Sequence, residues 1–246
     1  MKKILFLFTL IFSLGILNIT TSCASSLPIY DETYNNNQGN KSMLEEIEEL
    51  IKFIQIEYGK ITNNWEHSTY YEKINLKNNQ VYEVIENKLI LDTIIKYREF
   101  ISENNIDLMM DFKKFNSNNA TVNSRTKAKN SIEFKIKNYI DNHENGKVPI
   151  NKCFNDLFGI RIICNTDISF DEIFNLIDTK YDNLKCIDSS KKEYKATHVY
   201  FKKDNFSFQW ELQIWNKKDE NNNIKSHEKY KQDYVKWENE NKEKRG

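Results

Sequence analysis

The clearest pattern in the chain is the unbroken alternation of apolar and polar residues in FSFQWELQIW, residues 206–215. Alternation with a period of two is typical of a strand that buries one face. The apolar face would carry Phe206, Phe208, Trp210, Leu212 and Ile214, and the polar face Ser207, Gln209, Glu211 and Gln213. A β-like run over 195–201 precedes this strand across 203–205, so the pattern predicts a hairpin. Glu211, in mid-strand on the polar face, is either solvated or part of a site.

Two further segments predict strands. NDLFGIRIIC, residues 155–164, is rich in apolar β-branched residues, which indicates a largely buried strand with Arg161 on the opposite face from its isoleucines. Asp156 at the mouth of this strand is either a turn or cap residue or a ligand for a hard cation, because an unpaired buried carboxylate is costly. TVNSRTK, residues 121–127, alternates as a strand and places Arg125 and Lys127 on one face.

Capping signals and apolar stripes predict the helices. Capping-box spacings occur at Ser42 with Glu45, Asn130 with Glu133, and Ser169 with Glu172. The Asn130 pair would open a helix at Ser131, directly after the strand over 121–127, and a further helix is expected over 81–101. The inward stripes would be Leu44, Ile47, Leu50, Ile51 and Ile54 after Ser42; Val84, Ile85, Leu89, Ile90 and Ile94 in 81–101; and Phe170, Ile173, Phe174 and Ile177 after Ser169. Tyr230, Tyr234 and Trp237 are expected to pack from one face of a C-terminal helix.

The first 24 residues have the basic, apolar and small-residue regions of a secretory signal, which predicts export or membrane anchoring. Cys23 resembles a lipoprotein acylation site and would give a lipid anchor; cleavage after Ala24 and an uncleaved anchor are the alternatives. Residues 25–40 are polar and asparagine-rich, so they are expected to be a linker.

Composition narrows the chemistry. The 246 residues include 36 basic and 36 acidic side chains, so no global field draws the chain to nucleic acid or to an acidic membrane. The four histidines lack the short paired spacing of a zinc site. The remaining cysteines, with Cys164 in the apolar run, do not indicate a disulfide scaffold.

RTKAKNSIEFK, residues 125–135, places three of its cations and one hydroxyl at spacings that, beside a predicted helix start, suit a polyphosphate. Arg125, Lys127, Ser131 and Lys135 are its polar contributors; the alternative is a solvated basic strand and helix. Asp156 and Glu211, from different strands, could hold one Mg²⁺ against the phosphates.

Five segments appear in the order and rough spacing of the RelA/SpoT alarmone synthetase domain: RTKAKNSIEFK, DLFGIR, YKATH, ELQI and SHEKYK. The chain resembles this family over about residues 119–236, leaving a helical N-terminal region at 41–118 and a charged tail at 237–246. The resemblance implies an α+β fold, with a mixed β-sheet flanked by helices as in nucleotidyltransferases. No His-Asp dipeptide occurs, so the hydrolase half of long members is expected to be absent.

The family moves the terminal pyrophosphate of ATP to the 3′-hydroxyl of GDP or GTP, making (p)ppGpp. By similarity, Arg125 and Arg161 would sandwich the adenine, and Lys127, Ser131 and Lys135 would hold the ATP phosphates. Asp156 and Glu211 would bind Mg²⁺, with Glu211 also placed to accept the proton of the attacking hydroxyl. The resemblance also assigns Tyr194 to stacking on the acceptor base, Lys195 and His198 to the acceptor phosphates, and Gln213 to support of the glutamate.

Two positions depart from the family pattern. Glu193 stands where glycine is usual, and Trp215 where arginine is usual, so the acceptor is open. A toxin of this fold that modifies adenine nucleotides or the 3′ end of tRNA is one alternative; an inactive surface lipoprotein that uses the fold to bind a partner is another. A homo-oligomer is a further expectation for a small synthetase-only protein.

Overall fold

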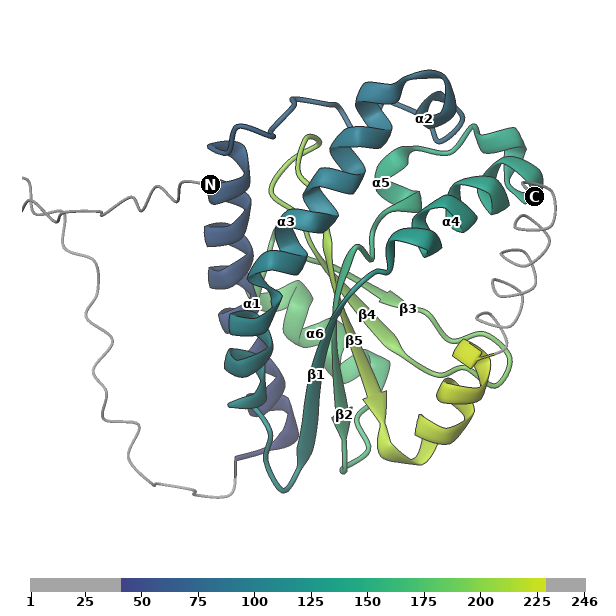
Figure 1. The fold of residues 1–246 in the computed structure, drawn as a ribbon. Helices are drawn as coiled ribbons and strands as arrows, with labels where there is room; N and C mark the ends of the chain where they lie inside the picture. The colour runs from purple at the N-terminus through teal and green to yellow at the C-terminus, as the bar shows by residue number, and fades with distance from the viewer. Residues whose placement is uncertain (1–40, 229–246) are drawn as a thin grey trace, which may run out of the picture. The chain divides into compact units, whose positions relative to one another are not determined.

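A five-stranded mixed sheet forms the centre of the computed structural model, which describes residues 41–228 (Figure 1). The strands are β1 (Ala120–Thr126), β2 (Phe158–Cys164), β3 (Lys185–Asp188), β4 (Thr197–Phe201) and β5 (Trp210–Asn216). Their order is β1-β2-β5-β4-β3, with β2 and β5 parallel and the other neighbours antiparallel. The α+β fold with a mixed sheet is therefore confirmed, and so is the hairpin of β4 and β5.

Helices precede the sheet and connect its strands. They are α1 (Met43–Glu66), α2 (Glu83–Glu86), α3 (Lys88–Lys113), α4 (Lys129–Asn142), α5 (Ile150–Cys153) and α6 (Phe170–Lys180), with short 3₁₀ turns at Glu144–Gly146 and Lys217–Asp219. A further helix follows the second turn and is described over 220–228. The capping boxes predicted at Ser42 and Ser169 are both present and begin α1 and α6.

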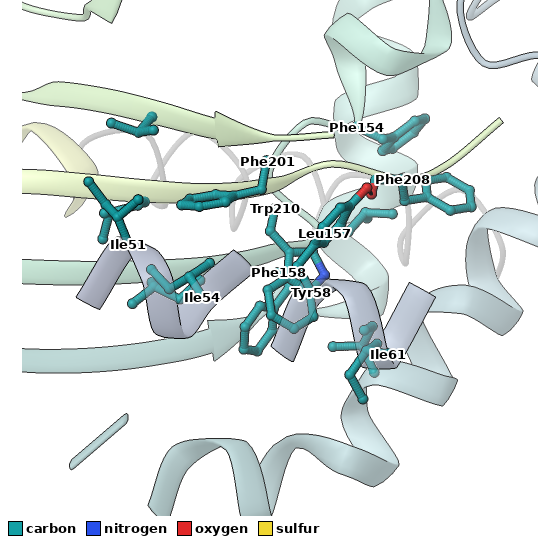
Figure 2. Packing of buried hydrophobic residues seen from close by; sticks show 14 of the residues in the cluster. Ile51, Ile54, Tyr58, Ile61, Phe154, Leu157, Phe158, Phe201, Phe208 and Trp210 are labelled. Atoms are coloured by element: carbon teal, nitrogen blue, oxygen red, sulfur yellow. Dashed lines mark hydrogen bonds between the residues drawn. The ribbon is translucent and has the colours of Figure 1, made fainter. Parts of the chain in front are cut away.

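One face of the sheet and the long helices share a single hydrophobic core (Figure 2). Tyr58 of α1 packs edge-on against Trp210 of β5, and its hydroxyl donates to the carbonyl of Phe208 at 3.1 Å. The indole of Trp210 donates to the Tyr97 hydroxyl of α3 at 3.0 Å. The helices before residue 119 therefore complete the core on which the sheet lies.

The opposite face of the sheet is polar, because strand register brings the polar positions of three strands together. Glu211 pairs with Gly159 of β2 and Tyr200 of β4, while Gln213 pairs with Arg161 and His198. Paired residues point to the same side of a sheet, so these side chains project together. In Figure 1, α4 and the helix after β5 lie on the side of the sheet away from α1 and α3.

One predicted helix start and one predicted continuous helix are wrong. Helix α4 begins at Lys129 with Ala128 as its N-cap, so Asn130 already lies in the first turn and cannot form the predicted capping box with Glu133. The single helix expected over 81–101 is interrupted at Asn87, whose backbone is extended and whose side chain accepts from the amide of Leu89. Asparagine favours this local bond over helix continuation.

Several predicted inward residues also lie elsewhere. Ile85 and Leu89 flank the break and are 68% and 49% exposed, so the assumed continuous stripe misplaced them. Phe174 is 39% exposed, and Leu176 takes its expected place in the core. Strand β5 begins at Trp210, because the segment before it folds into a loop in which Asp204 accepts from the amide of Phe206 and the hydroxyl of Ser207.

The predicted signal segment, Cys23, the linker, and the aromatic residues Tyr230, Tyr234 and Trp237 lie outside the described residues. Within 41–228, no helix combines the length and the hydrophobicity that crossing a bilayer requires.

Candidate active site

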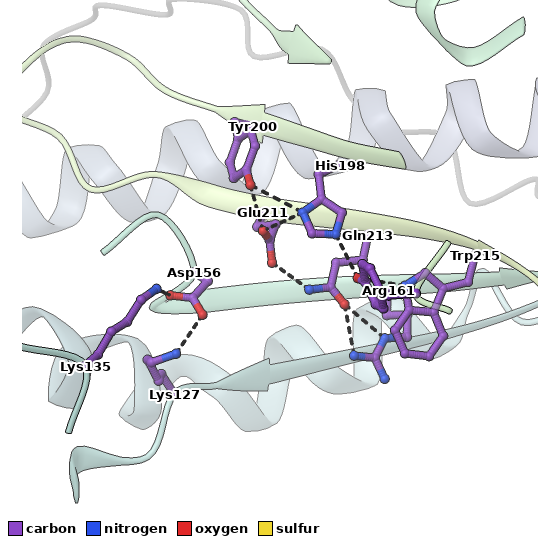
Figure 3. A network of polar contacts seen from close by, with 10 residues as sticks. Lys127, Lys135, Asp156, Arg161, His198, Tyr200, Glu211, Gln213 and Trp215 are labelled. Atoms are coloured by element: carbon purple, nitrogen blue, oxygen red, sulfur yellow. Dashed lines mark hydrogen bonds and ion pairs between the residues drawn. The ribbon is translucent and has the colours of Figure 1, made fainter. Parts of the chain in front are cut away.

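A buried ion-pair triad stands at the end of the sheet where β1 passes into α4. Lys127 Nζ contacts Asp156 Oδ2 at 2.6 Å, and Lys135 Nζ contacts Asp156 Oδ1 at 2.9 Å (Figure 3). Lys127 follows β1, where its amide donates to the carbonyl of Leu157, and Lys135 projects from the second turn of α4. The three side chains are only 11–14% exposed, so two cations and one carboxylate are held out of water together.

The triad leaves an excess positive charge. Burial by itself would raise the pKa of Asp156, but the ammonium groups of Lys135 and Lys127 outweigh it and hold that pKa well below its usual range. Burial lowers the pKa of Lys127, and the nearby Lys135 and Arg125 act in the same direction. Asp156 is thus ionised, and both cations are placed to prefer a more highly charged anion than one carboxylate.

A second cluster surrounds Glu211, which is 4% exposed. Oε1 of Glu211 accepts from the hydroxyl of Tyr200 at 2.9 Å and lies 3.0 Å from Nδ1 of His198. Oε2 accepts from Nε2 of Gln213 at 2.7 Å. Burial would raise the pKa of Glu211, but the hydrogen bonds and charge of His198 lead the effects that lower it, so this carboxylate is also ionised.

Both ring nitrogens of His198 have polar partners. The indole of Trp215 donates to the Tyr194 hydroxyl at 3.3 Å, and that hydroxyl lies 2.9 Å from Nε2 of His198. The ionised carboxylate of Glu211 can only accept a hydrogen bond, so Nδ1 of His198 carries a proton and donates to Oε1 of Glu211. Tyr194 and His198 are therefore joined directly to the carboxylate cluster.

Arg161 is held flat against this cluster. Its Nε and Nη2 atoms donate to Oε1 of Gln213 at 3.1 and 2.9 Å, and its guanidinium lies 3.6 Å from the centre of the Trp215 ring. The guanidinium thus makes a cation–π contact with Trp215 and donates two hydrogen bonds to one oxygen of Gln213. Burial, then the nearby Arg125, lowers the pKa of Arg161 to about 10. Trp215 thus supplies a stacking surface where the sequence suggested only the loss of a cation.

Most of the predicted site residues come together on this face. Arg125 on β1 stands opposite Gly159, and its side chain lies close to that residue: a Cβ at Gly159 would be at ordinary contact distance, 3.9 Å, from Arg125 Cγ and Nε. Ser131 lies in the first turn of α4, one turn before Lys135. Lys195 is separate: it is exposed and lines a different cavity, of about 330 Å³, with Ser169 and Lys218.

Sequence patterns did not identify three residues that contact or support the site. Tyr200 contacts Glu211 directly, and its signal was its position two residues after His198 on the same strand face. Asn223, fully buried, accepts from the amide and donates to the carbonyl of Lys195 at 2.8 Å each, which fixes the last described helix against the strand that carries His198. Arg98 of α3 donates to the carbonyl of Lys127, and no local pattern marks that contact.

Two ionised, buried carboxylates fit a Mg²⁺ ion by their chemistry, since Mg²⁺ takes hard oxygen ligands and is usually held by one or two carboxylates plus phosphate. Asp156 lies just before β2, and Glu211 lies in the neighbouring parallel strand β5, where it pairs with Gly159 of β2. No group of three or more His, Cys, Asp or Glu side chains within 41–228 could hold a metal ion. Asp156 and Glu211 would supply the protein's share of a Mg²⁺ donor set that phosphate oxygens complete.

No family model matches the chain, and no curated protein matches it. Among solved structures, it is similar to small alarmone synthetase 1 from Bacillus subtilis, at 18% identity over 57% of this chain and 78% of that one, with a TM-score of 0.34. A second structure of that synthetase, bound to AMPCPP, matches at 20% identity over 53% of this chain and 72% of that one, with a TM-score of 0.30. At these TM-scores the functional argument rests on the residues of the site itself.

Proposed function

We propose that the chain transfers the β,γ-pyrophosphate of ATP to the 3′-hydroxyl of GDP or GTP. The observation that carries this proposal is the pair of buried carboxylates, Asp156 and Glu211, beside two buried lysines on one sheet face. Three of the five sequence segments that resemble RelA/SpoT synthetases supply those residues. Phosphoryl-type transfer depends on positioning and charge neutralisation, which is what this arrangement offers.

The donor would lie across β1, β2 and the start of α4. Lys127 and Lys135 bind the phosphates, helped by Ser131 at the helix N-terminus. Arg125 and Arg161 bind the adenine between their planar groups. A phosphate chain gives the two lysines a stronger partner than Asp156, and so makes the oxygens of Asp156 available.

Asp156 and Glu211 would hold the Mg²⁺, which neutralises phosphate charge when it is bound. Glu211 accepts the proton of the attacking hydroxyl, since its ionised carboxylate is buried beside the acceptor residues Tyr194 and His198. Gln213 fixes Glu211 and Arg161 together, because it donates to one and accepts from the other. Lys195 is exposed just before β4, the strand that carries His198, and would contact acceptor groups that extend beyond this face.

The test is incubation of the protein lacking residues 1–24 with γ-labelled ATP and Mg²⁺ and, in separate reactions, GDP, GTP, AMP, ADP and deacylated tRNA. Label on GDP or GTP is the expected outcome. Label on an adenine nucleotide or on tRNA would show that the acceptor is not GDP or GTP, while the pyrophosphate transfer itself would stand. A folded protein that labels none of them would overturn the proposal in favour of a binding module.

For location, we propose export or membrane anchoring through the first 24 residues, with action on nucleotides inside a target cell as one consequence. Metabolic labelling with a palmitate analogue distinguishes a lipid-anchored protein from a simply secreted one. Label that is lost in Cys23→Ser supports a lipid anchor, whereas unlabelled protein in the medium supports simple secretion. Protein that stays in the cytoplasm without label would contradict both.

A further inference from the structure

The oxygens of Glu211 are unequally occupied. Oε1 has two donors, the hydroxyl of Tyr200 at 2.9 Å and Nδ1 of His198 at 3.0 Å. Oε2 has one, the amide of Gln213 at 2.7 Å. Because each carboxylate oxygen offers about two acceptor positions, Oε1 is saturated and Oε2 keeps one open position.

Tyr200 makes this asymmetry. It stands directly opposite Glu211 in the β4–β5 register, and its hydroxyl also lies 3.3 Å from Nδ1 of His198, so Tyr200, His198 and Glu211 form a closed triangle (Figure 3). Without the hydroxyl, Oε1 would regain an acceptor position and Glu211 could turn about its last bond.

We propose that Tyr200 is a positioning residue that blocks one oxygen of Glu211 and directs the open position of the other, Oε2, toward the metal. This inference rests on the proposed function. It adds that the site uses Glu211 through one oxygen and that the tyrosine hydroxyl sets which one. A supporting contact of this kind orients a metal ligand without touching the metal.

Tyr200→Phe removes one hydroxyl and keeps the ring. Tyr181→Phe is the matched control, because its hydroxyl is buried at the C-cap of α6 without a hydrogen-bond partner. Mn²⁺ with AMPCPP serves as the probe, and water-proton relaxation reports the ternary complex with the protein. Tyr200→Phe should weaken that complex about 10–100-fold, while Tyr181→Phe matches wild type.

Kinetics give the second readout. Transfer by Tyr200→Phe should show a lower kcat with a nearly unchanged KM for the acceptor, whereas a purely structural defect would lower the melting temperature and leave the ternary complex of the folded fraction intact. Unchanged Mn²⁺–AMPCPP affinity in Tyr200→Phe would overturn the inference. A weakened complex in a protein whose wild type transfers nothing would support the role of Tyr200 and overturn the proposed function instead.

Discussion

At the scale of single residues, the site depends on charges that burial makes costly and that specific partners make tolerable. Asp156 has two lysines and Glu211 has three donors, so each carboxylate remains ionised out of water. Removing the charge of Asp156 would leave two buried ammonium groups without a partner and would destabilise the fold, so Glu211 is the better position for a test of the chemistry.

Glu211→Gln should lower transfer by at least about 100-fold, because a neutral amide is a poor ligand for Mg²⁺ and a poor base. The amide keeps the size of the side chain, so circular dichroism should match wild type. Glu49→Gln, which alters a surface ion pair with Lys41, is the control and should transfer normally. Near-normal transfer by Glu211→Gln would refute the assigned metal site.

His227 gives the protein a pH dependence. Its ring stacks on Trp215, its Nε2 is buried without a hydrogen-bond partner, and burial lowers its pKa to about 4, from 6.5. Between these values the unfolded chain binds a proton that the folded chain does not, so stability falls as the pH is lowered from 6.5 toward 4. Acidification should thus favour unfolding.

His227→Phe keeps a stacking ring without the titrating group. Between pH 7 and 5 the wild type should lose about 1–2 kcal/mol more unfolding free energy than this variant, measured by urea denaturation at each pH. His67→Gln, which alters an exposed histidine, should keep the wild-type slope. Equal slopes in wild type and His227→Phe would show that His227 is not buried in this way.

At the scale of elements, tyrosine hydroxyls of the helices form hydrogen bonds to the sheet and to the loop that leads into it. Tyr58 of α1 donates to the carbonyl of Phe208 and accepts from the amide of Lys203 at 3.0 Å, so one side chain ties α1 to the loop that joins β4 and β5. That loop leads directly into the strand that carries Glu211.

Tyr58→Phe should cost about 1–3 kcal/mol of unfolding free energy, because it leaves two backbone groups unpaired in a largely buried place. Denaturant unfolding measures the loss, and Tyr181→Phe is again a suitable control, with a hydroxyl that makes no hydrogen bond. A change below about 0.5 kcal/mol would mean that water replaces the hydroxyl at this joint.

Sequence patterns predicted the elements best where local chemistry decides the structure. Ser42 and Ser169 begin helices because both halves of each capping box lie within four residues. Asn87 was missed because its extended backbone interrupts an apolar stripe that looked continuous. Phe206 was placed in a strand because alternation does not reveal that Asp204 would hold a turn there.

For the site, the sequence indicated the charged residues but not which side chains contact one another. Asp156 and Glu211 stood out as acids in apolar strands, whereas Tyr200 looked like an ordinary strand residue until the register placed it opposite Glu211. Lys195 was assigned from the resemblance, but it lies just before β4 and its exposed side chain lines another cavity. Pairing between strands is non-local, so a linear pattern could not give these contacts.

At the scale of the whole molecule, the helices before residue 119 and the sheet form one buried cluster. Ile51 and Ile54 of α1, Tyr97 and Phe112 of α3, and Trp210 of β5 are all at most 1% exposed. No second core is available to the helices alone, within the described chain, that would let them remain folded while the sheet opens. Folding of the helices and formation of the site are therefore expected to be coupled.

Hydrogen exchange measured by mass spectrometry tests this coupling. With increasing denaturant, peptides from α1 and from β5 should converge on the same opening free energy, because exposing either breaks the shared core. Peptides of α6, whose Lys180 pairs with Glu48 of α1, should follow them. If α1 opened several kcal/mol more easily than β5, the helices would be a detachable module, and the strands that carry Glu211 and His198 would have to be stable without them. Two hydrogen bonds argue against that outcome: Tyr58 of α1 donates to the carbonyl of Phe208, and Trp210 of β5 donates to Tyr97 of α3. Opening α1 or α3 would leave Phe208 and Trp210 without these partners.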